Sequence, residues 1–234
     1  MNGRRALIIA YWIVALASLA GASIMLFTYT PTEVTMGVVQ KIFYFHLPVA
    51  ICSLLACAVV FVASIGYLWQ RRMWWDDLAH AAGVVAVLLL SIVLITGMIW
   101  GKSAWGQWWT WSSWRLTFSL VLWLLYVVYL MIRPAIESPN RRAVVCAVYG
   151  IAAFVDVPLV YLSVKLLPET VHPESIALEP KMQLTLGLWF VPVTLLTAGM
   201  IAARFNLNRR LRAMYERNRG ELSAPAPVLS GGQA

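Results

Sequence analysis

The sequence predicts an all-α integral membrane protein with six transmembrane helices and both termini in the cytoplasm. Three observations lead to this fold class: the composition, the number of long apolar runs, and the distribution of arginine and lysine. Of 234 residues, 61% are hydrophobic and 12% are charged, and the mean hydropathy is +0.76. A soluble domain carries about 25% charged residues. The composition therefore indicates that lipid surrounds most of the chain.

The apolar residues form six long runs, at about 6–27, 47–69, 78–99, 116–132, 143–165 and 182–203. Each run is about the length that an α-helix needs to cross a hydrocarbon core of roughly 30 Å. Lipid offers no partners for backbone polar groups, so each run is predicted to be helical. The first run is too long for the apolar core of a signal peptide and is predicted to be retained. We expect one transmembrane domain over 1–204, followed by a cytoplasmic tail over 205–234 that is first basic and then flexible.

The basic residues predict the orientation. With six spans, the N-terminus, the loops after the second and fourth spans, and the tail share one side. That side holds 13 of the 18 lysines and arginines: Arg4, Arg5, Arg71, Arg72, Arg133, Arg141, Arg142, Arg204, Arg209, Arg210, Arg212, Arg217 and Arg219. An excess of basic residues marks the cytoplasmic side. The net charge of +8 thus reflects topology, and the predicted partner is the bilayer, with no nucleic acid.

A tryptophan-rich segment follows the third span. Six of the 12 tryptophans fall within "WGKSAWGQWWTWSSW" at 100–114. An interfacial aromatic belt accounts for single tryptophans but poorly for six in one loop. Flat indole rings suit apolar contact with a large planar ligand, and glycines let the backbone approach it. The candidate platform consists of Trp100, Gly101, Trp105, Gly106, Trp108, Trp109 and Trp111.

Two of the three histidines lie on the same side as this segment. His46 stands at the start of the second span, and His172 lies in the loop "LPETVHPESIALEP". Neutral imidazole is the commonest protein metal ligand, and haem iron takes histidine as an axial ligand. Lys41 and Arg115 are cations on this side that suit anionic haem propionates. The pattern suits haem held between His46 and His172, and the residues alone leave open the alternative that both are ordinary polar surface histidines.

Other unusual residues are interpreted more simply. His80, at the cytoplasmic start of the third span, is predicted to be structural or interfacial. Three cysteines lie inside apolar runs without a C-x-x-C-H motif, so they are predicted to be small buried residues. Asp156 lies within the fifth span, where carboxylates are costly. Its role stays open between a hydrogen bond inside the bundle and a part in the site.

Taken together, "KIFYFHLPVA", "TGMIWGKSAWGQWWTW" followed by "RLT", and "DVPLVYLSV" with a histidine in the next outer loop resemble the tryptophan-rich (WWD) haem-handling proteins of cytochrome c biogenesis. Within these, the chain is most similar to the CcmC family, haem exporter protein C of system I cytochrome c maturation. The resemblance covers about residues 35–190, and the order of motifs agrees throughout.

The resemblance implies roles for individual residues and partners. The tryptophan motif, Trp100 to Trp111, would hold haem b non-covalently at the outer face of the bacterial inner membrane. His46 and His172 would be the axial iron ligands, and Lys41 and Arg115 would help place the haem edge. The haem would be presented to the periplasmic chaperone CcmE, beside CcmA, CcmB and the small CcmD.

This chain departs from the family pattern at one place. The family motif usually continues W-W-x-W-D, one residue, then R-L-T, whereas this chain reads "WWTWSSWRLT". Ser112 therefore replaces an aspartate, and one extra residue precedes Arg115. The change removes an acceptor that would orient the loop or the chaperone.

Two other function classes fit parts of the sequence. A bis-histidine b-type cytochrome subunit would ligate haem between facing spans, whereas His46 and His172 lie at or outside the predicted membrane boundary. A permease subunit would line a path with polar residues and often shows repeat symmetry, but the spans carry almost no charge. The sequence contains neither a phosphate-binding P-loop nor a nucleophile–base pair in the outer loops. We therefore expect a haem-binding and haem-transfer protein, not an enzyme.

Overall fold

The computed structural model describes residues 3–166 and 178–223, which form seven α-helices and one short 3-10 helix. The helices are α1 (Gly3–Thr28), α2 (Lys41–Gln70), α3 (Met73–Trp105), α4 (Trp114–Ile132), α5 (Pro139–Ala153), α6 (Asp156–Leu166) and α7 (Pro180–Ser223), and the 3-10 helix η1 spans Val38–Gln40. Six helical segments are long and apolar enough to cross a membrane, with α5 and α6 together forming the fifth. The prediction of six spans is confirmed.

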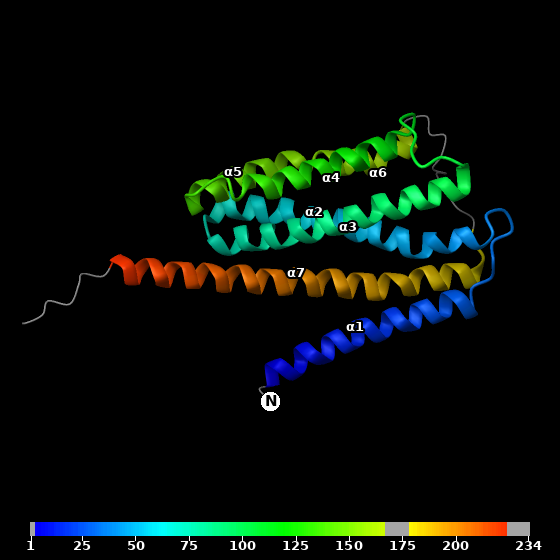
Figure 1. The fold of residues 1–234 in the computed structure, drawn as a ribbon, viewed down its shortest axis with the longest axis horizontal. Helices are drawn as coiled ribbons and strands as arrows, with labels where there is room; N and C mark the ends of the chain where they lie inside the picture. The colour runs from blue at the N-terminus through cyan, green and yellow to red at the C-terminus, as the bar shows by residue number, and fades with distance from the viewer. Residues whose placement is uncertain (1–2, 167–177, 224–234) are drawn as a thin grey trace, which may run out of the picture.

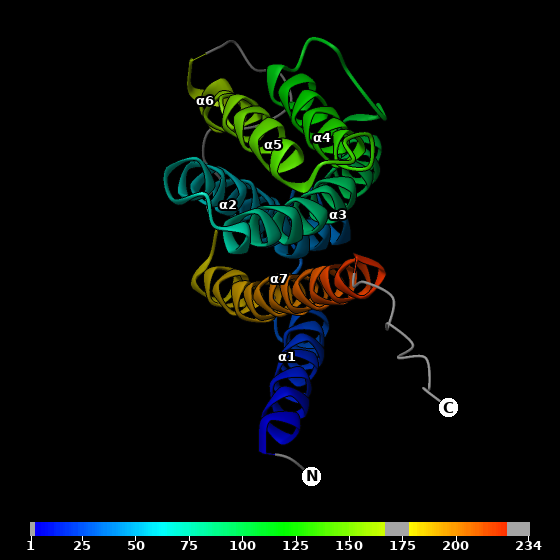
Figure 2. The same ribbon diagram turned by 90° about the vertical axis from the view of Figure 1, so that its left-hand side faces the viewer.

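The helices pack in layers (Figures 1 and 2). Helices α4, α5 and α6 form one layer, α2 and α3 form the next, α7 lies beneath them, and α1 is outermost against α7. The main core lies between the first two layers and contains Val60, Leu122 and Tyr126, all fully buried. The three cysteines are buried and free, as predicted.

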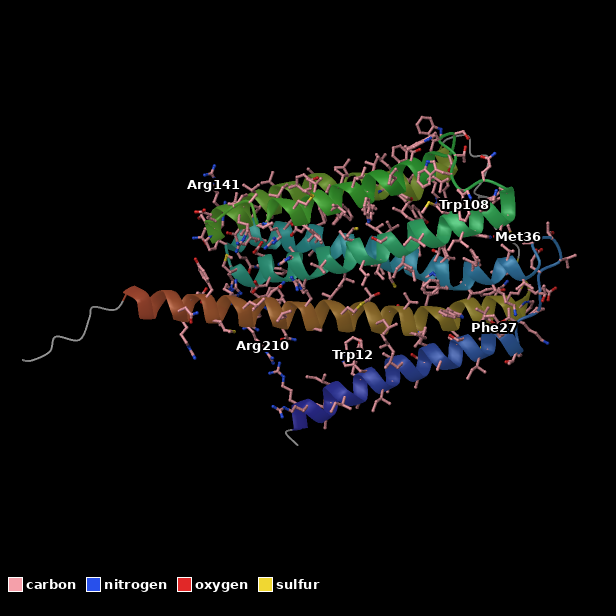
Figure 3. All side chains as sticks on the ribbon, in the orientation of Figure 1. Trp12, Phe27, Met36, Trp108, Arg141 and Arg210 are labelled. Carbon is pink, nitrogen blue, oxygen red and sulfur yellow. The ribbon has the colours of Figure 1, made fainter. Side chains whose placement is uncertain are left out.

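The bundle has two distinct ends (Figure 3). The tryptophan end holds the loop 29–37 and the segment 106–113, and Met36 and Trp108 lie there. The arginine end holds the connections 71–72 and 133–138, and Arg141 and Arg210 lie toward it. The structure thus separates the tryptophan-rich segment from most of the basic residues along the length of the helices.

Local sequence explains where the helices on either side of the tryptophan-rich segment begin and end. Helix α3 continues through Trp105 and stops at Gly106, which has a φ of 75° and donates its N–H to the Lys102 carbonyl oxygen at 3.1 Å. Glycine adopts this left-handed conformation at little cost. Helix α4 starts after Ser113, whose hydroxyl accepts the N–H of Leu116 at 3.4 Å. Ser113, which follows the serine that replaces the family's aspartate, therefore caps the N-terminus of α4.

The fifth span is broken in its middle. Helix α5 ends at Ala153, and α6 begins at Asp156. Pro158 explains the break because it has no N–H for the carbonyl of Phe154, four residues earlier, and its ring would clash with that carbonyl. Asp156 is 6% exposed and its Oδ2 has no hydrogen-bond partner within the described parts of the chain. Its carboxyl group faces the bundle and does not line the cavity described below.

The last helix is longer than a membrane span. α7 has 44 residues, so at about 1.5 Å per residue it is roughly 66 Å long. It extends past the predicted end of the sixth span at residue 203. The basic first part of the expected tail, 205–223, is therefore helical, and the remainder, 224–234, lies outside the described residues.

Candidate haem site at the tryptophan end

A cavity of about 210 Å³ opens between α2, α3, α4 and α6 near the tryptophan end. Its wall is mainly apolar and includes Leu47, Leu94 and Val160. Four predicted site residues also line it: His46, Trp100, Trp109 and Arg115. Residues far apart in the sequence thus meet around one space, which is the arrangement expected of a ligand pocket.

His46 lies in the second turn of α2, and its ring contacts α3. Its Nδ1 lies 2.8 Å from the Thr96 hydroxyl oxygen. That hydroxyl donates to the Ile92 carbonyl oxygen at 2.7 Å, so it is placed to accept a hydrogen bond from Nδ1–H of His46. The neutral ring then carries its lone pair on Nε2, the nitrogen suited to bind a metal. A hydrogen bond that fixes the tautomer in this way is usual for metal-ligating histidines.

Trp100 holds the aromatic part of the wall together. It is 5% exposed, and its ring centroid lies 5.8 Å from those of Phe43 and His46 and 5.7 Å from that of Trp105. These tilted and edge-to-face contacts stabilise aromatic clusters. Trp100 therefore fixes the His46 ring from the side, while Thr96 fixes it through Nδ1.

Two indole N–H groups at this cavity are buried without acceptors. Nε1 of Trp100 and Nε1 of Trp109 have no hydrogen-bond partner in the described part of the chain. A buried donor left unsatisfied costs about 1–3 kcal/mol, and native structures rarely leave one without a reason. Both tryptophans line a cavity that could hold a ligand with acceptor oxygens.

The remaining tryptophans lie around the mouth of the site. Trp108 is 58% exposed and Trp111 is 72% exposed, and the ring of Trp111 lies 5.6 Å from that of Trp109. Trp105 and Gly101 line a small neighbouring space with Trp108 and Trp109. A Cβ added at Gly101 would lie 3.2 Å from the Gln107 carbonyl oxygen, so the segment folds back closely on α3 there.

The predicted cations take different positions. Arg115 lines the cavity, and its Nη2 donates to the Tyr161 carbonyl oxygen of α6 at 3.4 Å. Lys41 does not reach the cavity, because its ammonium group lies 5.0 Å from the ring centroid of Phe27 on α1. Ser112 forms a hydrogen bond with Thr110 at 2.7 Å, within the loop. The second predicted iron ligand, His172, lies outside the described residues.

Sequence reasoning missed Phe43, Thr96 and Tyr161 at this site. Thr96 lies four residues before Trp100, so both fall on one face of α3, and a lone threonine in an apolar span was the available clue. Phe43 and Tyr161 carry no comparable clue, because aromatic residues near a membrane boundary are common.

Comparison with known proteins identifies the family. The family model described as "Heme exporter protein C" matches residues 2–224. The chain belongs to the heme exporter protein C family.

Individual family members agree with this result. The chain is 29% identical to heme exporter protein C of Rhodobacter capsulatus over 220 residues, covering 89% of this chain and 90% of the relative. It is 31% identical to that of Escherichia coli K12 over 199 residues, covering 82% and 78%. It is 30% identical to that of Bradyrhizobium diazoefficiens over 193 residues, covering 79% and 73%. Family membership and six apolar helices make it a multi-pass membrane protein of haem transport in cytochrome c biogenesis.

Proposed function

We propose that this protein binds haem b non-covalently at the periplasmic face of the bacterial inner membrane and presents it to the chaperone CcmE. The observation that carries the proposal is the single cavity lined by His46, Trp100, Trp109 and Arg115. Its residues supply an imidazole nitrogen for iron, indole surfaces for the porphyrin, and donors for propionate oxygens. Family membership supports haem as the cargo.

Each residue has a distinct task in this proposal. His46 binds iron through Nε2, because Thr96 holds the proton on Nδ1. Arg115 and the Nε1 groups of Trp100 and Trp109 donate to propionate oxygens, which satisfies the two buried indole N–H groups. His172, which lies outside the described residues, would supply the second iron ligand, and two histidine ligands would give a low-spin iron.

The size of the cavity suits a protein that passes its cargo on. Pockets that enclose drug-sized ligands measure about 300–1,000 Å³, whereas this cavity measures about 210 Å³. Only part of a haem enters it, and the exposed rings of Trp108 and Trp111 cover part of the remainder. A haem edge that stays exposed is accessible to a chaperone.

The membrane orientation follows from the charges. The tryptophan end faces the periplasm, and the arginine end and both termini face the cytoplasm, in agreement with the positive-inside rule. CcmA, CcmB and CcmD are the proposed complex partners. Lys41 contributes to long-range attraction of the propionates from beside the site, since its ammonium group lies over Phe27.

Haem transfer tests this function against its strongest alternative. The full-length protein is loaded with haem in lipid nanodiscs and mixed with haem-free CcmE, and the haem on each protein is measured. The proposal predicts that haem moves to CcmE and that the haem-depleted protein can be reloaded. Haem that stays bound and cycles between oxidation states without transfer would instead identify a b-type cytochrome subunit.

A further inference from the structure

A second and larger cavity lies at the arginine end, far along the bundle from the haem site. It measures about 790 Å³ and is bounded by α3, the connection between α4 and α5, α5 itself and α7. This volume falls within the range of about 300–1,000 Å³ typical of ligand pockets. Nothing in the proposed haem function uses this cavity.

Four arginines line the cavity, and two of them are already paired. Arg133 donates to the Asp76 carboxylate at 2.6 Å, and both side chains are buried. Arg212 pairs with Asp77, whose backbone carbonyl also accepts from Asn208 at 3.1 Å. These two pairs join α3 to α4 and α3 to α7, and they form a fixed, polar part of the cavity wall.

The other two arginines have no such partners. Arg142 of α5 and Arg204 of α7 each have a buried Nε without an acceptor, and neither guanidinium forms an ion pair with any residue in 3–166 or 178–223. Nη1 of Arg212 is also buried and has no acceptor in the described part of the chain. Arg142 and Arg204 are half-buried, so water reaches part of each side chain, but a buried Nε without an acceptor still costs free energy. Both residues line one cavity and form no ion pair within the described residues, so each offers donor groups to an anion bound there.

The carboxylates of the cavity do not fill this role. Asp76 and Asp77 are engaged by Arg133 and Arg212, and Glu137 and Glu216 are exposed at the rim. Exposed charges are screened by water and salt, so the rim glutamates weaken the attraction of an anion only modestly. The half-buried charges of the cavity that form no ion pair within the described residues are therefore those of Arg142 and Arg204.

We propose that this cavity binds a phosphate group through Arg142 and Arg204. A phosphate offers several acceptor oxygens, so it can take N–H groups from both guanidiniums at once, and arginine is well suited to such multiple contacts. Leu130, Leu211 and Met73 line the same cavity and give an apolar surface for the glycerol or acyl part of a phospholipid. Basic pockets between helices near the cytoplasmic surface commonly hold anionic lipid headgroups.

Lipid retention by the full-length protein tests the proposal. The protein is reconstituted in nanodiscs of phosphatidylglycerol or of phosphatidylcholine, released from the discs, and analysed by native mass spectrometry for lipid that stays bound. The double variant Arg142→Gln/Arg204→Gln is compared with Arg210→Gln, an exposed charge of α7 that does not line the cavity. We expect the wild type and Arg210→Gln to retain phosphatidylglycerol and the double variant to bind it about tenfold or more weakly.

Added inorganic phosphate distinguishes the source of the group. If phosphate in phosphatidylcholine discs raises the unfolding temperature of the wild type but not of the double variant, the site takes soluble phosphates. Should the double variant fail to insert, Arg142→Lys/Arg204→Lys keeps the charges and should bind with intermediate affinity. Equal lipid retention by all variants, with no effect of phosphate, would overturn the proposal. Haem spectra should be the same in every variant, so this result does not depend on the haem site.

Discussion

His46 Nδ1 and Thr96 Oγ1 lie 2.8 Å apart, and this contact joins the proposed iron ligand on α2 to α3. The Thr96 hydroxyl donates to the Ile92 carbonyl oxygen at 2.7 Å, so its oxygen is available to His46 as an acceptor. The direction of this bond leaves Nε2 as the nitrogen that would bind iron under the proposed function, and it orients the ring. The contact therefore provides the most direct test of how the site is built.

Replacing Thr96 by valine keeps the shape of the side chain but removes the acceptor. We expect haem affinity to fall by about 10- to 100-fold, as is usual when the hydrogen-bond partner of a metal ligand is lost, and the low-spin fraction to fall with it. Thr96→Ser keeps the hydroxyl and should restore both. Haem titration followed by absorption provides the measurement, and equal affinities for the valine and serine variants would contradict the role given to Thr96.

Gly97 lines the cavity, and its lack of a side chain leaves room there beside His46. A Cβ at this position would lie 3.4 Å from Cε1 of His46, so the branched side chain of Gly97→Val would press on the ring and enter the cavity. We predict loss of most haem binding with normal membrane insertion. Gly187→Val is the matched control, because nothing lies within 4 Å of a Cβ at Gly187. Haem binding by Gly97→Val at the level of the control would show that the cavity is not the haem site.

A substitution at Trp109 distinguishes two contributions of its indole ring: stacking on the haem and donation of a hydrogen bond by Nε1–H. Trp109→Phe keeps an aromatic ring but removes the buried Nε1–H group that has no acceptor within the described chain. If this group donates to a propionate, affinity for haem should fall about tenfold, while affinity for a haem with esterified propionates should change less. Trp69→Phe, at an exposed position in the last turn of α2, is the control. If the substitution lowers the affinity for both haems equally, Trp109 contributes only by stacking.

Gly83 tests the packing between α3 and α4. A Cβ at this position would lie 2.7 Å from Cε1 of Tyr129, a buried residue whose hydroxyl accepts from Arg133 at 3.3 Å. Overpacking of this kind costs about 1–3 kcal/mol, so Gly83→Ala should lower the unfolding temperature. Gly21→Ala in α1 meets nothing within 4 Å and should leave that temperature unchanged or slightly raised. Equal unfolding temperatures for the two variants would show that Tyr129 can move aside for the added methyl group without loss of stability.

The sequence predicted the parts of the fold that depend on length and polarity. Six spans follow from apolar runs alone. The break between Ala153 and Asp156 was missed, because a proline inside an apolar run is also tolerated as a kink. The helical extension of α7 to Ser223 was missed because a basic, polar sequence at the end of a span resembles a solvent-exposed tail.

Part of the site was predictable for a different reason. His46, Trp100, Trp109 and Arg115 were identified by residue type and motif, and they line one cavity. Thr96 could not be assigned because its role depends on the rotation of α3 against α2, which a nearly uniform apolar sequence does not specify. Lys41 was expected beside the haem, yet the start of α2 turns it toward Phe27.

The first measurement is the absorption spectrum of the purified, haem-loaded protein, oxidised and then reduced with dithionite, because it reports the iron ligands. It is recorded for the wild type, His46→Ala and His172→Ala. We expect a low-spin b-type spectrum in the wild type that each substitution weakens or converts to high spin. A wild type that binds no haem, or a spectrum that neither substitution alters, would contradict this expectation and would leave the tryptophan-rich segment as a protein-docking surface.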